Sequence, residues 1–173
     1  RVSAAGALLA GPTGSQVDGG SFDYSGTPLV WADDRFAIVS SPLGITEIAG
    51  DGTVLRFGDI EAATVLHRPS LAWSGIEYGV VWRRPVDQSI RFTRIDGTGR
   101  VPGSERTLHP GPWAGEADIV WADLGEWGVT WNVGHVGDPL DIHFARLAPD
   151  GTLRSNAEVL GGPVDDSWPQ LTW

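Results

Sequence analysis

The stretch LAWSGIEYGVVWRR, Leu71–Arg84, contains two short apolar runs that each end in a tryptophan. Small and polar residues, Ser74–Glu77, separate the two runs. In the second run Tyr78, Val80 and Trp82 alternate along the chain, so they share one face of a strand. The stretch therefore predicts a β-hairpin. Because an isolated hairpin is marginally stable in water, this one must belong to a larger sheet.

Two landmarks of this hairpin recur along the chain. The runs PLVW, SLAW, DIVW and QLTW end at tryptophans separated by 42, 48 and 52 residues. Glycines that follow another predicted strand are separated by 46, 47 and 52 residues. Two landmarks in register four times indicate an internal repeat. The tryptophans are Trp31, Trp73, Trp121 and Trp173, and the glycines are Gly6, Gly52, Gly99 and Gly151.

Each repeat unit is predicted to contain four short strands. In one unit these are Pro69–Trp73, Tyr78–Trp82, Ser89–Ile95 and, after a glycine turn, about Arg100–Leu108. Asp-Gly pairs at 51–52, 96–97 and 150–151 are typical of that turn, because glycine adopts a positive φ without a steric penalty. Four-stranded units that recur every 46 to 52 residues predict an all-β fold, a β-propeller built of blades.

The pattern W-x-x-x-x-[YW]-G-V-x-W, followed by I-x-F-x-R-[IL]-x-x-x-G, resembles a propeller repeat of secreted and surface proteins from myxobacteria and their relatives. The resemblance covers essentially the whole chain. It implies an extracellular or cell-surface location but little about chemistry, because that group is largely uncharacterised. The unit from Trp31 to Gly52 departs most, since Ala37–Ser40 lacks both the glycine and the closing tryptophan. We expect that blade either to be splayed or to have a distinct neighbour.

The repeat divides the chain into parts of a ring. Residues 27–68, 69–116 and 117–168 are predicted to be full blades, 1–26 the end of one blade, and 169–173 the first strand of the next. A split blade that lacks a strand leaves hydrogen-bonding edges open, and open edges invite pairing. We expect another copy, or another fragment of the same precursor, to complete the ring. The start at Arg1, without Met or a signal-like segment, suggests processing or truncation.

Composition excludes several kinds of chemistry. The 173 residues have a net charge of −10, and this acidic balance argues against a nucleic-acid partner. All 12 cationic side chains are arginines, and they are scattered along the chain. Without lysine or cysteine, the chain has no Schiff-base amine, thiol nucleophile or disulfide. No apolar run approaches the roughly 20 residues of a membrane span. Glycine and proline make about a fifth of the chain, which is typical of short elements joined by tight turns.

The tryptophans fall into two predicted groups. Those in the repeating strand columns are expected to pack between blades: Trp31, Trp73, Trp82, Trp121, Trp131 and Trp173. Trp127 lies outside those columns. Trp113 and Trp168 occupy Pro/Gly-rich connections just before a first strand. We predict that these two stack on a ligand, such as a sugar ring, while Glu116, Asp165 and Asp166 accept hydrogen bonds from its hydroxyl groups.

The remaining acidic residues and the histidines give weaker signals. Asp138 and Asp141 share one loop, so Ca²⁺ is a candidate ligand there. A solvated loop is the alternative, since the D-x-D-x-D-G spacing is absent. The four histidines show no metal-ligand spacing, and the chain has no G-x-S-x-G, P-loop or dinucleotide-binding motif. We therefore predict no catalytic residue and a binding protein rather than an enzyme.

The predicted function is recognition: a secreted or surface module that binds glycan or protein through propeller loops or the rims between blades. A first alternative is a hydrolase or lyase with its site in the central channel of the completed ring. A second alternative is a structural scaffold in a larger extracellular assembly.

Overall fold

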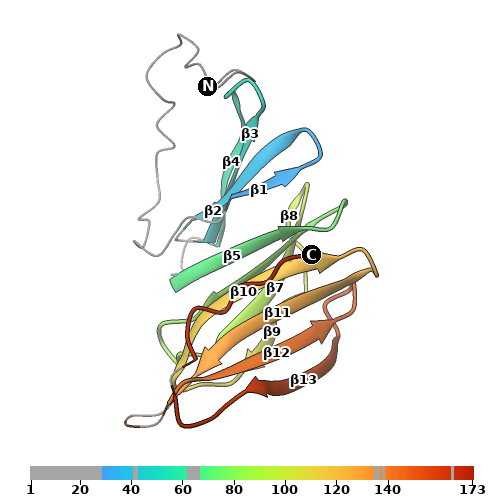
Figure 1. Ribbon diagram of the computed structural model, residues 1–173. Helices are drawn as coiled ribbons and strands as arrows, with labels where there is room; N and C mark the ends of the chain where they lie inside the picture. Colours follow the sequence, from blue (N-terminus) through green and yellow to red (C-terminus); the bar gives the residue numbers. More distant parts are fainter. Residues whose placement is uncertain (1–28, 41–42, 62–66, 135–136, 138, 165) are drawn as a thin grey trace, which may run out of the picture.

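A computed structural model describes residues 29–40, 43–61, 67–134, 137, 139–164 and 166–173. These residues form thirteen strands in three antiparallel sheets that follow one another along the chain (Figure 1). Within this described part no helix is long and apolar enough to cross a membrane. The all-β prediction is confirmed.

Each sheet uses consecutive strands, and the bounds are as follows. Sheet 1 contains β1 (Leu29–Ala32), β2 (Arg35–Ser40), β3 (Leu43–Ala49) and β4 (Val54–Glu61). Sheet 2 contains β5 (His67–Trp73), β6 (Tyr78–Arg83), β7 (Ile90–Asp96), β8 (Gly99–Arg100) and β9 (Arg106–His109). Sheet 3 contains β10 (Ala114–Ala122), β11 (Glu126–Val133), β12 (Asp141–Leu147) and β13 (Leu153–Leu160).

The hairpin predicted from Leu71–Arg84 is confirmed as β5 and β6. Trp73 pairs with Tyr78, and the Ser74 amide donates to the Glu77 carbonyl at 3.0 Å. Each of the three sheets has an aromatic pair at this position, with one ring on the first strand and one on the second. The ring centroids of each pair are 4.5 to 4.7 Å apart. These pairs are Trp31 with Phe36, Trp73 with Tyr78, and Trp121 with Trp127.

The Asp-Gly turns are confirmed at 51–52 and 150–151, whereas in the turn at 96–97 the positive φ falls on Gly99 instead of Gly97. Gly52 and Gly151 have φ values of 86° and 82°, in the left-handed region that favours glycine. In each of the three turns the aspartate Oδ1 accepts the amide of the threonine two residues later, at 2.7 to 2.9 Å. This side-chain turn satisfies a backbone donor that the hairpin would otherwise leave open. The aspartates are Asp51, Asp96 and Asp150.

The fourth strand of sheet 2 differs from the prediction. Instead of one strand over Arg100–Leu108, the short strands β8 and β9 both pair with β7. Pro102 has no amide hydrogen and Gly103 has a φ of 69°. The backbone between β8 and β9 therefore leaves its hydrogen-bonded pairing with β7. The Ser104 hydroxyl bridges this break, because it accepts the Arg94 amide and donates to the Val101 carbonyl.

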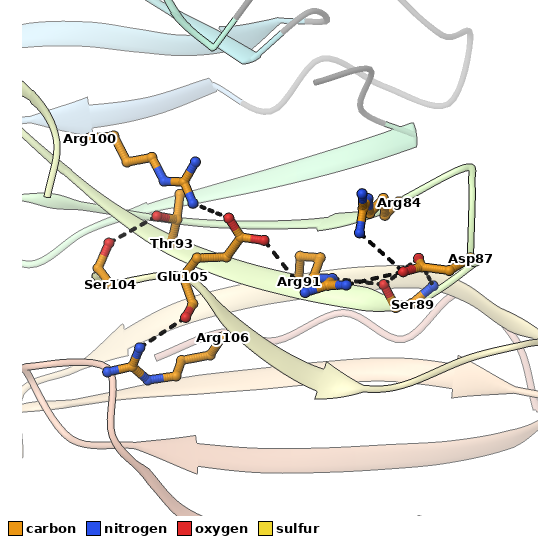
Figure 2. A network of polar contacts seen from close by, with 9 residues as sticks. All are labelled: Arg84, Asp87, Ser89, Arg91, Thr93, Arg100, Ser104, Glu105 and Arg106. Atoms are coloured by element: carbon orange, nitrogen blue, oxygen red, sulfur yellow. Dashed lines mark hydrogen bonds and ion pairs between the residues drawn. The ribbon is translucent and has the colours of Figure 1, made fainter. Parts of the chain in front are cut away.

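Ion pairs hold these outer strands to β7 (Figure 2). Glu105 contacts both Arg91 and Arg100, and Arg91 in turn contacts Asp87 at 3.0 Å. Hydrogen bonds from the hydroxyl and amide of Ser89, together with Arg91, lower the pKa of Asp87 to about 2. This carboxylate therefore secures the turn between β6 and β7.

The sheets pack through an aromatic ring placed against a small residue. A Cβ on Gly79 of β6 would lie 2.7 and 2.8 Å from ring atoms of Trp127, so only glycine lets β11 approach this closely. At the junction of sheets 1 and 2, Tyr78 shares a buried cluster with Ala37. Ala37 stands where Gly79 stands in sheet 2, and its strand β2 pairs without a register shift with both β1 and β3, so the sheet is not splayed there.

A charged pair in each sheet lies beside this contact. In sheets 2 and 3 a glutamate at or just before the start of the second strand pairs with an arginine of the third: Glu77 with Arg94, and Glu126 with Arg146. Sheet 1 has the reverse, Arg35 with Glu47, at 3.8 Å. The reversal has a physical reason, because Glu47 accepts the Tyr78 hydroxyl at 2.8 Å. Burial, and then this hydrogen bond, raise the pKa of Tyr78.

The tryptophan prediction is partly wrong. Trp82 and Trp131 are fully buried and Trp73 and Trp121 pack against the core, as expected. Trp31 and Trp173, however, are 51% and 65% exposed, because no neighbouring sheet covers them in the described structure. Trp127, expected to stand apart, is fully buried at the centre of the junction between sheets 2 and 3.

The first strands of successive sheets are joined by Asp118 of β10. Its Oδ1 accepts the Ser70 hydroxyl of β5 at 2.6 Å, and its Oδ2 accepts the Leu171 amide at 2.8 Å. The C-terminal residues thus lie beside β10, where a following first strand was expected, but they form no assigned strand.

The close approach at Gly79 predicts a large effect of one methyl group. Gly79→Ala should lower the free energy of unfolding by about 1–3 kcal/mol, because the Trp127 ring must move. Gly97→Ala is the matched control, since a Cβ there meets nothing within 4 Å. Urea unfolding of both variants measures the difference. Equal stability of the two variants would contradict the described packing.

Candidate functional site

The predicted ligand-binding residues lie at one end of sheet 3. Trp113 directly precedes β10, Glu116 lies within it, and Asp141 begins β12. Asp166 and Trp168 follow β13. Asp138 and Asp165 lie outside the described residues. This is the end at which β10 and β12 begin and β11 and β13 finish.

Trp113 is held by its backbone at the rim between sheets 2 and 3. Its amide donates to Gln88 Oε1 of the β6–β7 turn at 3.3 Å, and its carbonyl accepts the Gly134 amide at 3.1 Å. Its φ of 82° turns the chain sharply after Gly111–Pro112. The indole is 42% exposed, so a fixed backbone presents a large apolar surface to solvent.

Trp168 and Asp166 lie on the other side of sheet 3. The Asp166 amide donates to the Leu140 carbonyl at 2.9 Å, and Asp166 helps to line a hollow of about 410 Å³ beside Ile142 and Phe144. Trp168 is 61% exposed. Ile142 and Phe144 face away from sheet 2, whereas Asp141 and His143 face toward it. The structure therefore does not bring Trp168 together with Trp113.

Glu116 has a structural role that the sequence did not indicate. Its Oε2 accepts the side-chain amide of Asn132 at 2.8 Å, and Asn132 is almost completely buried. A carboxylate that satisfies a buried amide stabilises the pairing of β10 with β11. Ligand binding by Glu116 stays a prediction beside this structural role.

A pocket of about 510 Å³ lies at the same end, between sheets 2 and 3, and we call it the inter-sheet pocket. His109 of β9 contributes from sheet 2, and the other polar side chains come from sheet 3. Gly134, whose amide donates to the Trp113 carbonyl, lines it, so the backbone of Trp113 lies close to the pocket. Its lining residues are His109, Val133, Gly134, Pro139, Asp141, His143, Glu158 and Gly162.

The polar groups of this pocket are arranged by strand register. Asp141 and His143 share one face of β12, and Glu158 of β13 is the register partner of His143. Both the Asp141 and Glu158 carboxylates would contact a Cβ placed on Gly161, so they approach each other over that glycine. The His143 ring stacks on the ring of the buried Trp131, with centroids 5.7 Å apart. The centroid of the His109 ring lies 5.9 Å from that of His143.

The electrostatics of the pocket favour a neutral His109. Burial, and then the neighbouring His143, lower the pKa of His109. A neutral imidazole offers one donor and one acceptor nitrogen, and each carboxylate offers acceptor oxygens. These groups suit a ligand that carries several hydroxyl groups.

Sequence reasoning identified Asp141 but missed His109, His143 and Glu158 as a group. The alternation of Asp141 and His143 along one strand indicates that these two side chains share a face, so His143 could have been found from the sequence. Glu158 and His109 could not be added, because their proximity depends on the register of β13 and on the packing of sheet 2.

In the described part of the chain no three histidine or acidic side chains are placed to share a metal ion. Asp138, the proposed companion of Asp141, is outside that part. Ca²⁺ binding therefore stays a prediction.

No protein-family model matches the chain, and no curated protein matches it. A solved structure does: a subtype N10 neuraminidase-like protein of A/little yellow-shouldered bat/Guatemala/060/2010, with a TM-score of 0.51 and 11% sequence identity. The match covers 77% of this chain and 43% of that chain. At such low identity the likeness shows the fold alone. It supports a β-propeller-like class for this all-β chain, whose described sheets do not close into a ring.

The lowered pKa of His109 predicts a pH dependence of stability. Between its folded pKa and the ordinary value near 6.5, the unfolded chain binds a proton that the folded chain excludes. The free energy of unfolding should therefore fall as the pH drops below about 7. His109→Gln should reduce this slope when urea unfolding is repeated from pH 7.5 to 5. An unchanged slope would show that other groups cause it.

Proposed function

We propose that the chain is a secreted or cell-surface recognition module that binds glycan at the inter-sheet pocket and Trp113. One observation carries the proposal: Asp141 and Glu158 line a solvent-accessible pocket together with Gly134, whose amide binds the backbone of the exposed Trp113.

The chemistry of these groups matches a sugar. An indole covers the apolar face of a pyranose ring, while carboxylates and a neutral imidazole hydrogen-bond its hydroxyl groups. Because the Trp113 backbone is held on both sides, little conformational entropy is lost when a ligand stacks on it. A pocket at a junction of rigid sheets is also a common position for a ligand site.

Trp168 and Asp166 belong to a second surface in this proposal, on the opposite side of sheet 3. If both surfaces bind the same polymer, the second contact becomes intramolecular and raises the overall affinity. The extracellular location is supported by the resemblance of the repeat pattern to secreted and surface proteins.

The proposal includes the architecture of the ring. Residues 27–68, 69–116 and 117–168 act as full blades, each with one of the three sheets at its centre. The predicted blade end at residues 1–26 lies outside the described residues, and residues 169–173 belong to a blade that another chain or segment completes. The open sheets and the propeller-like match support this arrangement.

Glycan binding can be tested with an array of oligosaccharides, followed by titration of the best ligand. Trp113→Ala should weaken binding at least about tenfold, because the lost stacking area is worth more than about 1.4 kcal/mol. Glu158→Gln should also weaken binding while retaining the shape of the pocket.

Trp173→Ala is the matched control, since its indole is 65% exposed and follows Leu171 along β10, away from the pocket. Its affinity should equal that of the wild type. An array without any bound glycan would contradict the proposed function, and equal losses in the Trp113 and Trp173 variants would contradict the proposed site.

A further inference from the structure

Two carboxylates of the inter-sheet pocket, those of Asp141 and Glu158, have no cationic partner among the described residues. Three other glutamates of sheets 2 and 3 are each paired with one or two arginines. These pairs are Glu77 with Arg94, Glu105 with Arg91 and Arg100, and Glu126 with Arg146 and Arg154. The negative charge of the pocket is therefore not neutralised within the described structure.

The two carboxylates lie close together. Asp141 begins β12, and Glu158 of β13 is the register partner of His143, which shares a strand face with Asp141. A Cβ on Gly161 would contact oxygen atoms of both carboxylates, so the glycine at this position keeps side chains out of the space between them. Like charges at close range repel each other, and a cation between them relieves the repulsion.

The other lining residues supply no cation. Burial, and then the neighbouring His143, lower the pKa of His109, so this imidazole is uncharged at neutral pH. No arginine lines the pocket. In sheet 2, Arg83 and His109 flank the buried Ile90, two strand spacings or about 10 Å apart at the backbone. The pocket is therefore complementary to a positively charged ligand.

A primary ammonium group suits this arrangement. It has three N–H donors, and the pocket offers the two carboxylates and the acceptor nitrogen of the neutral His109. Hydrogen bonds between an ammonium and a carboxylate are roughly twice as strong as those between neutral groups. An anionic ligand would instead add a further like charge to the pair.

A metal cation suits the described residues less well. Ca²⁺ takes about six to eight oxygen ligands. Within the described part of the chain, no three histidine or acidic side chains are placed to share a metal ion. An organic cation needs only hydrogen-bond acceptors, and the rest of the molecule can fill the pocket of about 510 Å³.

We propose that the inter-sheet pocket selects a glycan that carries a primary amine, an amino sugar such as glucosamine, over glycans that carry acidic groups. The ammonium lies between Asp141 and Glu158, and the sugar ring occupies the rest of the pocket. This inference rests on the proposed glycan binding and names the class of sugar that the same pocket takes.

Two features favour an amino sugar over a lysine side chain as the source of the ammonium. A pyranose holds its amine on a rigid ring, so less conformational entropy is lost than when a flexible lysine is fixed. Val133 and Pro139 give the pocket an apolar part that a sugar ring can cover. The net charge of −10 further attracts a polymer that repeats the cation along its length.

Calorimetric titration of the full 173-residue chain with two tetrasaccharides tests the proposal. One is a β-1,4-linked tetramer of glucosamine, and the other is the same tetramer with every amine acetylated. At about pH 6.5, below the pKa of such an amine, the glucosamine tetramer should bind at least about tenfold more tightly, because only it carries a cation. A tetramer of galacturonic acid should bind more weakly than both, since its carboxylates meet Asp141 and Glu158.

Glu158→Gln and Asp141→Asn should each lower the ratio of the two affinities at least about threefold, because one negative charge is lost while the shape is kept. The ratio is the readout because a variant that only damages the pocket lowers both affinities together. Asp123→Asn is the matched control, since it removes the same charge from the exposed turn between β10 and β11, at the opposite end of sheet 3. Its ratio should equal that of the wild type.

The possible failures are distinguishable. Equal, measurable affinities of the wild type for the two tetramers would overturn the amino-sugar inference and leave the proposed glycan binding in place. A lysine tetrapeptide that binds as tightly as the glucosamine tetramer would also overturn the inference, because the pocket would then recognise an ammonium group alone. If no glycan of any kind binds, both the inference and the proposed function are wrong.

Discussion

The contact between the Trp127 ring and the backbone of Gly79 is the constraint on which the described structure depends. A four-stranded sheet cannot bury both of its faces alone, so each sheet here needs a neighbour. The missing side chain of Gly79 lets that neighbour approach, and the indole fills the space. Phe92, Val81 and Trp131 then complete the same buried cluster. The inter-sheet pocket exists only because this junction holds His109 close to Asp141 and His143.

The parts of the fold that depend on local chemistry could be predicted from the sequence. The hairpin at Leu71–Arg84 follows from alternation and from the short polar connection between its strands. The Asp-Gly turns follow from the need for a positive φ, as Gly52 and Gly151 demonstrate. Such features involve residues close in sequence, so no knowledge of the tertiary arrangement is needed.

Features that depend on neighbouring sheets could not be predicted in the same way. Trp31 and Trp73 occupy the same column, yet one is exposed and the other packs against the core, because among the described residues only Trp73 has a neighbouring sheet on its open side. The hydrogen bond from the buried Asn132 to Glu116 joins residues 16 positions apart on neighbouring strands, so no local pattern indicates it. The pocket combines Glu158, Asp141 and His109, which are brought together by strand register and by packing between sheets.

The reversed charge pair in sheet 1 makes this sheet specific to its place beside sheet 2. Tyr78 needs an acceptor for its hydroxyl proton on the preceding sheet, and Glu47 supplies it. Trp127 needs no such acceptor there, because its indole nitrogen donates to Pro149 within its own sheet. An arginine at position 47 would leave the tyrosine proton unsatisfied. Sheets of the same architecture are thus specific to their places, and a change in their order along the chain would separate Tyr78 from its acceptor.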